Sequence, residues 1–186
     1  MKIETIRHSL AHILALAVQE IYPGTKFGIG PAIENGFYYD FDFVEADKRG
    51  LERGLTRITP EDLPRIEAKM RELIKKNLEF KKEIIDVKKA KQIFKNQPYK
   101  LELINEKLKM KNEKLTIYES DGFIDLCVGP HVKSSKEINP DVFKLTKIAG
   151  AYWRGSEKNP MLTRIYGVAF KNKKELEDYL LKEEEA

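Results

Sequence analysis

Hydrophobic positions near the start of the chain follow the period of an α-helix. In residues 6–21, apolar side chains occupy positions 6, 10, 13, 14, 17, 18 and 21, which places them on one face of a helix. Pro23 and Gly24 follow this segment and predict its end. Two histidines, His8 and His12, lie four residues apart within it, so a helix places their side chains one turn apart on the same side.

The period changes to that of β-strands after this helix. Strands are expected at residues 26–29 and 37–43, with a turn at Gly30-Pro31 between them and a hairpin turn at 34–36. A charged, irregular loop is expected to follow at residues 44–59.

The rest of the chain alternates between helical and hairpin patterns. It predicts a helix that begins at Thr59 and Pro60, a strand at 80–87, a short helix at 88–97, a hairpin that turns at 120–122, paired strands at 142–155 and 161–170, and a final helix capped by Asn172. The segment 99–108 fits a helix or a strand. This order predicts an α+β fold with a largely antiparallel sheet and packed helices.

Composition excludes several classes of protein. The chain has 186 residues, of which 41% are hydrophobic and 34% are charged, a balance typical of soluble globular proteins. No apolar run approaches the roughly 18 residues of a membrane span, and the N-terminus lacks the apolar core of a signal peptide. A single cysteine cannot form an internal disulfide. We therefore expect a cytoplasmic protein without membrane contact.

The charge of the chain is mildly basic, with a formal net charge of +4. Lysines gather in residues 75–100, whereas the C-terminal segment is acidic. A lysine-rich face can bind the phosphates of a nucleic acid, but it is also typical of a solvated helix surface. Charge is therefore compatible with an RNA partner and does not establish one.

All three histidines and the only cysteine fall into two pairs with the same spacing. His8 and His12 form the helical pair; Cys127 and His131 form the second, with a Gly-Pro step between them that predicts a tight turn after a strand. Four such side chains suit a tetrahedral zinc ion. They equally suit a metal-free hydrolytic cleft that uses them as hydrogen-bonding and proton-carrying groups. Each pair alone is more typical of structural residues, but the two together favour a shared site.

Four segments carry a resemblance to a known family. They are RHSLAHIL, IYPGTKFGIGPAIENGFYYDFDF, FIDLCVGPHV and KLTKIAGAYWRGSEKNPMLTRIYGVAF. In this order they resemble the editing domain of bacterial-type threonyl-tRNA synthetase, which is related to the editing domain of alanyl-tRNA synthetase. The resemblance covers essentially the whole chain. It implies that the partners are the 3′ acceptor end of tRNA(Thr) and the remaining domains of a parent synthetase.

The resemblance also implies a proofreading reaction, the hydrolysis of serine from mischarged seryl-tRNA(Thr). A synthetic site that selects threonine over serine gains only the burial of one methyl group, roughly 1–3 kcal/mol, which is too little for accurate translation. A second, hydrolytic pocket that admits serine and excludes the extra methyl group would supply the missing discrimination.

The functional residues of the family fall on matching positions of this chain. The catalytic set that the resemblance implies is His8, His12, Lys100, Cys127 and His131. The substrate-binding set is Asp125, Tyr39, Gly30 and Phe37. We expect Lys100 and His8 to polarise the attacking water and Asp125 to bind the α-ammonium group of serine. Tyr39 and the backbone of residues 28–31 would form the wall that excludes a methyl group.

Some of these residues also have a structural interpretation. A lysine can act here only if burial lowers its pKa or if it serves as an electrophile, and Lys100 would otherwise be solvated. In the AGAYWRG segment, Tyr152 or Trp153 could stack on a base, with Arg154 on a phosphate. Alternatively, this segment is a buried corner with Trp153 in the core.

The metal content separates two branches of the family. The alanyl branch implies zinc, whereas the threonyl branch implies hydrolysis without a metal. The Gly-Pro-His and AGAYWRG segments favour the threonyl branch, so we expect no cofactor. If zinc were bound, its ligands would be His8, His12, Cys127 and His131. The alternative functions are a zinc-dependent, alanyl-type trans-editing deacylase and a non-catalytic tRNA-docking module.

The resemblance predicts how the chain is organised. Residues 1–58 and 98–170 would form the cleft, 59–97 a helical insertion, and 171–186 a helix that connects to a following domain. No motif of an ATP-dependent ligase site is present in this chain. We therefore expect a deacylase fragment of a longer synthetase that does not itself activate threonine.

Overall fold

The computed structural model describes residues 1–43, 58–111 and 113–186. The charged loop expected at 44–59 lies outside the described residues except for its last two positions. The described strands pair antiparallel in two sheets, and helices pack against both. The expected α+β class with antiparallel sheets is confirmed.

The elements follow the predicted order closely. The helices are α1 (Ile3–Ile21), α3 (Leu63–Lys75), α4 (Val87–Ile93), α5 (Pro98–Lys109) and α6 (Lys173–Glu185), with short 3-10 turns η1 (Pro60–Asp62), η2 (Ser135–Glu137) and η3 (Trp153–Gly155). The strands are β1 (Lys26–Phe27), β2 (Ala32–Ile33), β3 (Gly36–Asp42), β4 (Lys81–Asp86), β5 (Lys114–Ser120), β6 (Phe123–Leu126), β7 (Phe143–Tyr152) and β8 (Met161–Ala169). The Asn172 side chain caps α6 by accepting a hydrogen bond from Glu175 N, as predicted.

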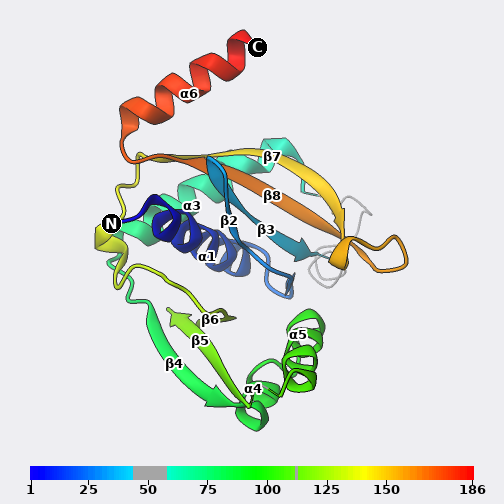
Figure 1. Cartoon of the computed structure of the whole chain (residues 1–186). Helices are drawn as coiled ribbons and strands as arrows, with labels where there is room; N and C mark the ends of the chain where they lie inside the picture. Colours follow the sequence, from blue (N-terminus) through cyan, green and yellow to red (C-terminus); the bar gives the residue numbers. More distant parts are fainter. Residues whose placement is uncertain (44–57, 112) are drawn as a thin grey trace.

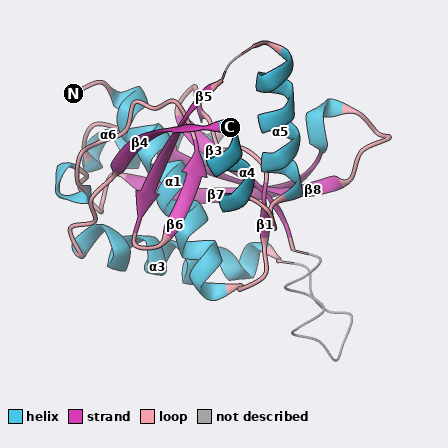
Figure 2. Ribbon diagram, turned by 90° about the horizontal axis from the view of Figure 1, so that it is seen from below, coloured by secondary structure: helices cyan, strands magenta, loops and turns pink. Residues whose placement is uncertain are grey.

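The two sheets differ in size and lie on different sides of α1. The larger sheet has the order β1-β3-β8-β7, with β2 paired to β3, and the smaller sheet has the order β4-β5-β6. Figure 1 shows the larger sheet above α1 and the smaller sheet below it. Seen from below in Figure 2, the smaller sheet lies in front of α1. Residues of α1, α5 and β6 border one cavity.

Helix α1 is buried more completely than its sequence predicts. Its apolar spacing predicts one buried face, but every residue from Ser9 to Val18 is buried. The helix packs against β3 on one side and against α3 and β6 on others. Three alanines at positions 11, 15 and 17, all fully buried, allow these neighbours to approach closely. His12 therefore lies in the interior, whereas His8 is half-buried and borders a cavity.

The segment 99–108, whose pattern fits a helix or a strand, forms most of α5. Pro98 occupies the first helical turn, where its missing N–H costs nothing. Ile104 packs with residues of the smaller sheet and α4, and Tyr99 packs with Trp153 and Leu162 at the end of the β7–β8 hairpin. These contacts fix α5 between the two sheets and point Lys100 inward.

The range 59–97, expected as a helical insertion, contains both helices and a strand, and it contacts both sheets. Its helix α3 packs on α1 and β7, and its strand β4 pairs with β5. Helix α6 covers residues 173–185 and projects away from the two sheets in Figure 1. Within the described part of the chain, no helix combines the length and apolar character that crossing a membrane requires.

Candidate active site

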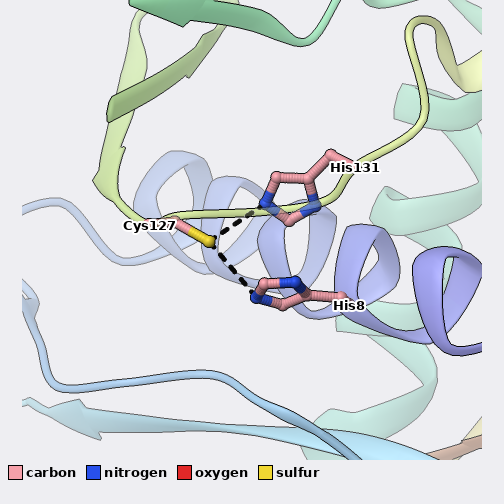
Figure 3. Close-up of side chains that lie close together, drawn as sticks. All are labelled: His8, Cys127 and His131. Atoms are coloured by element: carbon pink, nitrogen blue, oxygen red, sulfur yellow. Dashed lines mark hydrogen bonds between the residues drawn. The ribbon is translucent and has the colours of Figure 1, made fainter. Parts of the chain in front are cut away.

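Two distant parts of the chain meet around the only thiol. Cys127 follows β6, and its Sγ lies 3.3 Å from Nε2 of His8 on α1 and 3.4 Å from Nε2 of His131. Figure 3 shows both imidazoles pointing at the sulfur atom. Between Cys127 and His131, Gly129 has a φ of +80°, and a side chain there would overlap with the Tyr118 hydroxyl. The tight turn predicted after the strand is present. It brings the side chains of Cys127 and His131 into contact with His8 of α1.

Ser9 holds the turn against α1 and determines the tautomer of one imidazole. Its hydroxyl donates to Thr5 O at 2.8 Å, so its oxygen is left to accept hydrogen bonds. It accepts one from Val132 N at 3.0 Å and lies 3.2 Å from Nδ1 of His131. Nδ1 must therefore carry the proton, and Nε2 of His131 is an acceptor that faces the thiol.

Burial keeps all of these groups neutral. Desolvation raises the pKa of Cys127 to about 11, and it lowers the pKa of His131 to about 2. The pKa of His8 is also lowered, chiefly by burial, although nearby Asp125 opposes the shift. A protonated thiol can donate to Nε2 of His131, whereas a thiolate could not. Cys127 is thus a hydrogen-bonding group at neutral pH and a poor nucleophile.

The raised pKa of Cys127 predicts slow alkylation. At pH 7.5 Cys127 of the metal-free folded protein should react with iodoacetamide about 100-fold more slowly than an ordinary cysteine. Its pKa is higher by about two units, so its thiolate fraction is about 100-fold lower. The rate should rise steadily with pH up to about pH 10. The same protein in urea is the control, since unfolding restores an ordinary thiol. Equal rates in the folded and unfolded states at pH 7.5 would contradict this protonation state.

A second polar group lies beside the thiol cluster. Lys100 Nζ lies 2.6 Å from Asp125 Oδ1 and donates to the Tyr39 hydroxyl at 3.0 Å, and that hydroxyl donates to Asp125 Oδ2 at 3.0 Å. Lys100 is only 2% exposed. The interpretation of Lys100 as a solvated surface residue is therefore wrong, since its charge is held in the interior by Asp125. Burial raises the pKa of Tyr39 well above its usual range, so it acts as a neutral donor.

Several of these side chains line one cavity of about 310 Å³. Its walls include His8, Gly30, Lys100, Asp125 and Cys127, all of them expected from the sequence. The walls also include residues that no motif of the sequence indicates: Leu103, Lys107, Thr116 and Val128. Leu103 and Lys107 follow Lys100 by three and seven residues on α5, a spacing that identifies them only once this segment is known to be a helix.

Gly30 permits the close packing of the cavity wall. A side chain on Gly30 would overlap with the ring of Tyr39, which is 1% exposed and fixed by its two hydrogen bonds. The backbone of residues 28–31 therefore rests directly on this ring. The backbone N–H of Asp40 donates to Ile29 O at 2.9 Å, and the backbone N–H of Gly28 donates to Asp40 O at 2.8 Å. These two hydrogen bonds hold the segment in place.

Four of the expected site residues do not line the cavity: His12, Phe37, Tyr39 and His131. His12 is 1% exposed and packs against the rings of Phe80, Phe123 and His131. Among the described residues, neither ring nitrogen of His12 has a hydrogen-bonding partner. Phe37 is fully buried, and its ring fills the space above Gly167 in the neighbouring strand. Both positions support the walls from behind.

The donor atoms fit a zinc ion in part. The facing atoms of His8, Cys127 and His131 lie within 4.8 Å of one another, and the two sulfur–nitrogen distances match the roughly 3.5 Å between ligands of a tetrahedral zinc. Ser9 would orient His131 from behind, as partners of zinc ligands commonly do. His12 lies outside this three-residue group. These three residues could hold zinc, which would then supply an acidic bound water.

The AGAYWRG segment forms a buried corner around Trp153. This side chain is 4% exposed and its Nε1 donates to Glu102 Oε2 at 2.9 Å. Arg154 forms ion pairs with Glu102 and Glu106 on α5. Of the two interpretations of this segment, the core position is correct for Trp153. Tyr152, in contrast, remains 41% exposed.

Comparisons with known proteins agree with this arrangement. Residues 115–166 match a family model described as the threonyl and alanyl tRNA synthetase second additional domain. The chain is 52% identical over 179 residues to a threonine–tRNA ligase of Borreliella burgdorferi, which covers 96% of this chain and 29% of that protein. It is 52% identical over 185 residues to that of Thermotoga neapolitana, covering 98% of this chain and 27% of that protein.

The α+β fold, the polar cavity and the family match define the class of this protein. Residues 115–166 of the chain match the second additional domain of threonyl- and alanyl-tRNA synthetases. Within this class the chain corresponds, over nearly its whole length, to the editing-domain part of threonine–tRNA ligase, and the resemblance inferred from the sequence is confirmed. The chain spans less than a third of the length of these relatives.

Proposed function

We propose that this chain hydrolyses serine from mischarged seryl-tRNA(Thr) and so acts as the proofreading domain of a longer threonyl-tRNA synthetase. The observation that carries the proposal is the cavity itself. It brings together, on the walls of one cavity, the neutral imidazole of His8, the buried cation of Lys100 and the carboxylate of Asp125. Its partners are the 3′ acceptor end of tRNA(Thr) and the other domains of that synthetase.

The positions of the groups assign a role to each in this reaction. Hydrolysis of the ester consumes one water, whose oxygen bonds to the carbonyl carbon while the bond from that carbon to the ribose oxygen breaks. Neutral His8 is suited to accept a proton from the water, and the ribose oxygen takes up a proton as it leaves. Lys100 is suited to stabilise the negative charge that develops on the carbonyl oxygen, as an electrophile.

Asp125 is suited to bind the α-ammonium group of the seryl residue. Each of its oxygens has one partner in the structure, and an ionised carboxylate can accept about four hydrogen bonds. Cys127 forms the wall beside His8, and His131 supports Cys127 from behind. His12 supports His131 from behind and acts as a positioning residue, not as a catalytic one.

The rigid wall of Gly30 and Tyr39 supports selection for serine. Tyr39 is held by Lys100 and Asp125, so it cannot turn away from a larger substrate without breaking two hydrogen bonds. The extra methyl group of threonine would have to displace this wall. Steric exclusion of this kind can exceed the roughly 1–3 kcal/mol that a favourable methyl pocket supplies.

The test of this proposal is a deacylation assay with seryl- and threonyl-tRNA(Thr). We expect release of serine at least 100-fold faster than release of threonine, and a loss of about 10³-fold for His8→Ala, the usual size of a general-base contribution. Arg65→Ala, a change on the exposed side of α3, is the control. Slow release of serine by the unaltered chain, or full activity of His8→Ala, would contradict the proposal.

The alternative functions predict different results in this assay and in measurements of zinc content and tRNA binding. A zinc-dependent, alanyl-type deacylase would contain stoichiometric zinc on elemental analysis and would lose activity on chelation. A docking module would bind tRNA without releasing an amino acid. We propose the metal-independent reaction because Lys100 already places a cation inside the cavity, and we expect a chelator to leave the rate unchanged.

A further inference from the structure

A second cavity adjoins the proposed active site. Its volume is about 460 Å³, and Ile29 and Leu103 line both it and the first cavity. This volume lies within the range of about 300–1,000 Å³ typical of ligand sites. Because the two cavities share these walls, a ligand whose reactive end lies beside Cys127 can extend past Leu103 into the second cavity.

The far wall of this cavity is the corner between β7 and β8. Trp153 N donates to Pro160 O at 2.9 Å, and Asn159 Nδ2 donates to Trp153 O at 2.8 Å. Arg154 adopts a left-handed backbone conformation with a φ of +56°, which costs about 1–2 kcal/mol for a residue with a side chain. Strain of this kind often accompanies functional sites. Here it presents the Arg154 side chain to Glu106 at the edge of the cavity.

The charges that line the second cavity cancel. Arg164 forms a two-pronged ion pair with Asp40, at 2.7 and 3.0 Å, and Arg154 pairs with Glu106. No excess positive charge is left among these four residues to favour a phosphate. The lining is instead rich in planar groups with donors and acceptors at their edges, and the half-exposed ring of Tyr152 adds an aromatic face.

A neutral, planar and hydrogen-bonding ligand matches such a surface. Nucleobases have these properties, and proteins bind unpaired bases by stacking them on aromatic side chains and guanidinium planes. In a tRNA acceptor end, the nucleotide before the terminal adenosine is unpaired and is joined to it directly. Its base would reach the second cavity when the terminal ester lies in the first.

We propose that the second cavity binds the base of the penultimate nucleotide of the aminoacylated acceptor end, stacked on Tyr152. This inference rests on the proposed hydrolysis of seryl-tRNA. It adds a specificity site that holds the tRNA strand beside Leu103 and Glu106 of α5. The terminal ribose is thereby oriented before the ester reaches His8 and Lys100.

Three small substrates test the inference. They are the seryl ester of adenosine, the seryl ester of the dinucleotide cytidylyl-adenosine, and the same dinucleotide ester with an abasic first residue. Stacking of one base contributes about 5- to 150-fold, so kcat/KM for the complete dinucleotide should exceed that for the other two esters by at least about 10-fold. The abasic compound separates a contact to the base from a contact between Lys107 and the phosphate.

Variants of Tyr152 complete the experiment. Tyr152→Ala should reduce the ratio of kcat/KM between dinucleotide and adenosine esters to near one, whereas Tyr152→Phe should keep most of it. Ile84→Ala, at an exposed position on β4, should keep the ratio of the unaltered protein. An equal rate with all three esters, an advantage that persists without the base, or an unchanged ratio in Tyr152→Ala would overturn the subsite and leave the proposed hydrolysis intact. No hydrolysis of any ester, with seryl-tRNA(Thr) also left intact, would overturn both.

Discussion

Replacing Lys100 by methionine should abolish deacylation and destabilise the fold. The substitution leaves Asp125, which is 6% exposed, with Tyr39 as its remaining partner. Loss of one partner of a buried ion pair costs about 3–5 kcal/mol because the other charge stays uncompensated. We expect about 3 kcal/mol here, since Asp125 borders the cavity, together with a fall of about 10³-fold in the rate of serine release. Urea unfolding and the deacylation assay measure the two effects.

A double variant separates stability from catalysis. Lys100→Met with Asp125→Asn removes both charges and leaves Tyr39 a carbonyl oxygen to which it can donate. The double variant should recover more than half of the lost free energy of unfolding but none of the activity. Lys109→Met, at an exposed position of the same helix, is the matched control and should change neither quantity. Recovery of activity in the double variant would show that Lys100 acts only through the fold.

Replacing His12 by leucine should stabilise the protein, most strongly in acid. Burial lowers the pKa of His12 from 6.5 to about 4, so the folded state resists the protonation that the unfolded chain undergoes below pH 6.5. The titration of His12 therefore costs no stability above pH 6.5, and stability is lost as the pH falls from 6.5 towards 4. The shift corresponds to a loss of about 3 kcal/mol. His12→Leu should lack this loss.

Urea unfolding at pH 7 and at pH 4.5 measures the effect of His12. At pH 7 the leucine variant should already be equally or more stable, because the ring nitrogens of His12 have no partner among the described residues. His12→Gln is the control, since it keeps a buried polar group that does not titrate. It should lose stability at pH 7 but should share the flatter pH dependence of the leucine variant. The same acid sensitivity in all three proteins would show that His12 is hydrated in solution.

The order of helices and hairpins could be predicted because it depends on local spacing. The hairpin at 34–36 turns at Asn35 with a φ of +65°, and the hairpin at 120–122 turns at Asp121 and Gly122, all residues that tolerate this conformation. The segment 99–108 could not be assigned, because its mixture of apolar and charged residues fits both periods. Packing of Ile104 and Tyr99 on opposite neighbours selects the helix.

The candidate site was predicted less completely than the fold. The pairing of His8 with Cys127 could be expected because the chain has few such residues. The burial of Lys100 could not, since nothing in its neighbouring sequence distinguishes it from the exposed lysines around it. The sequence also did not indicate that His12 lies outside the group of His8, Cys127 and His131. Two residues on one side of a helix can meet different neighbours when that helix is covered on all sides.

By itself, the sequence determined the elements of this protein, the turns that join them and the side chains available for chemistry, because each depends on neighbours within a few residues. Only the tertiary structure decided which of those side chains share a cavity. Cys127 and His8 are 119 positions apart, and Ser9 brings them together by binding Val132 and His131 at once. The distinction between Lys100 and Lys109 arises in the same way. Desolvation and ion pairing depend on what packs around a group, and that is set by contacts between segments that no local pattern records.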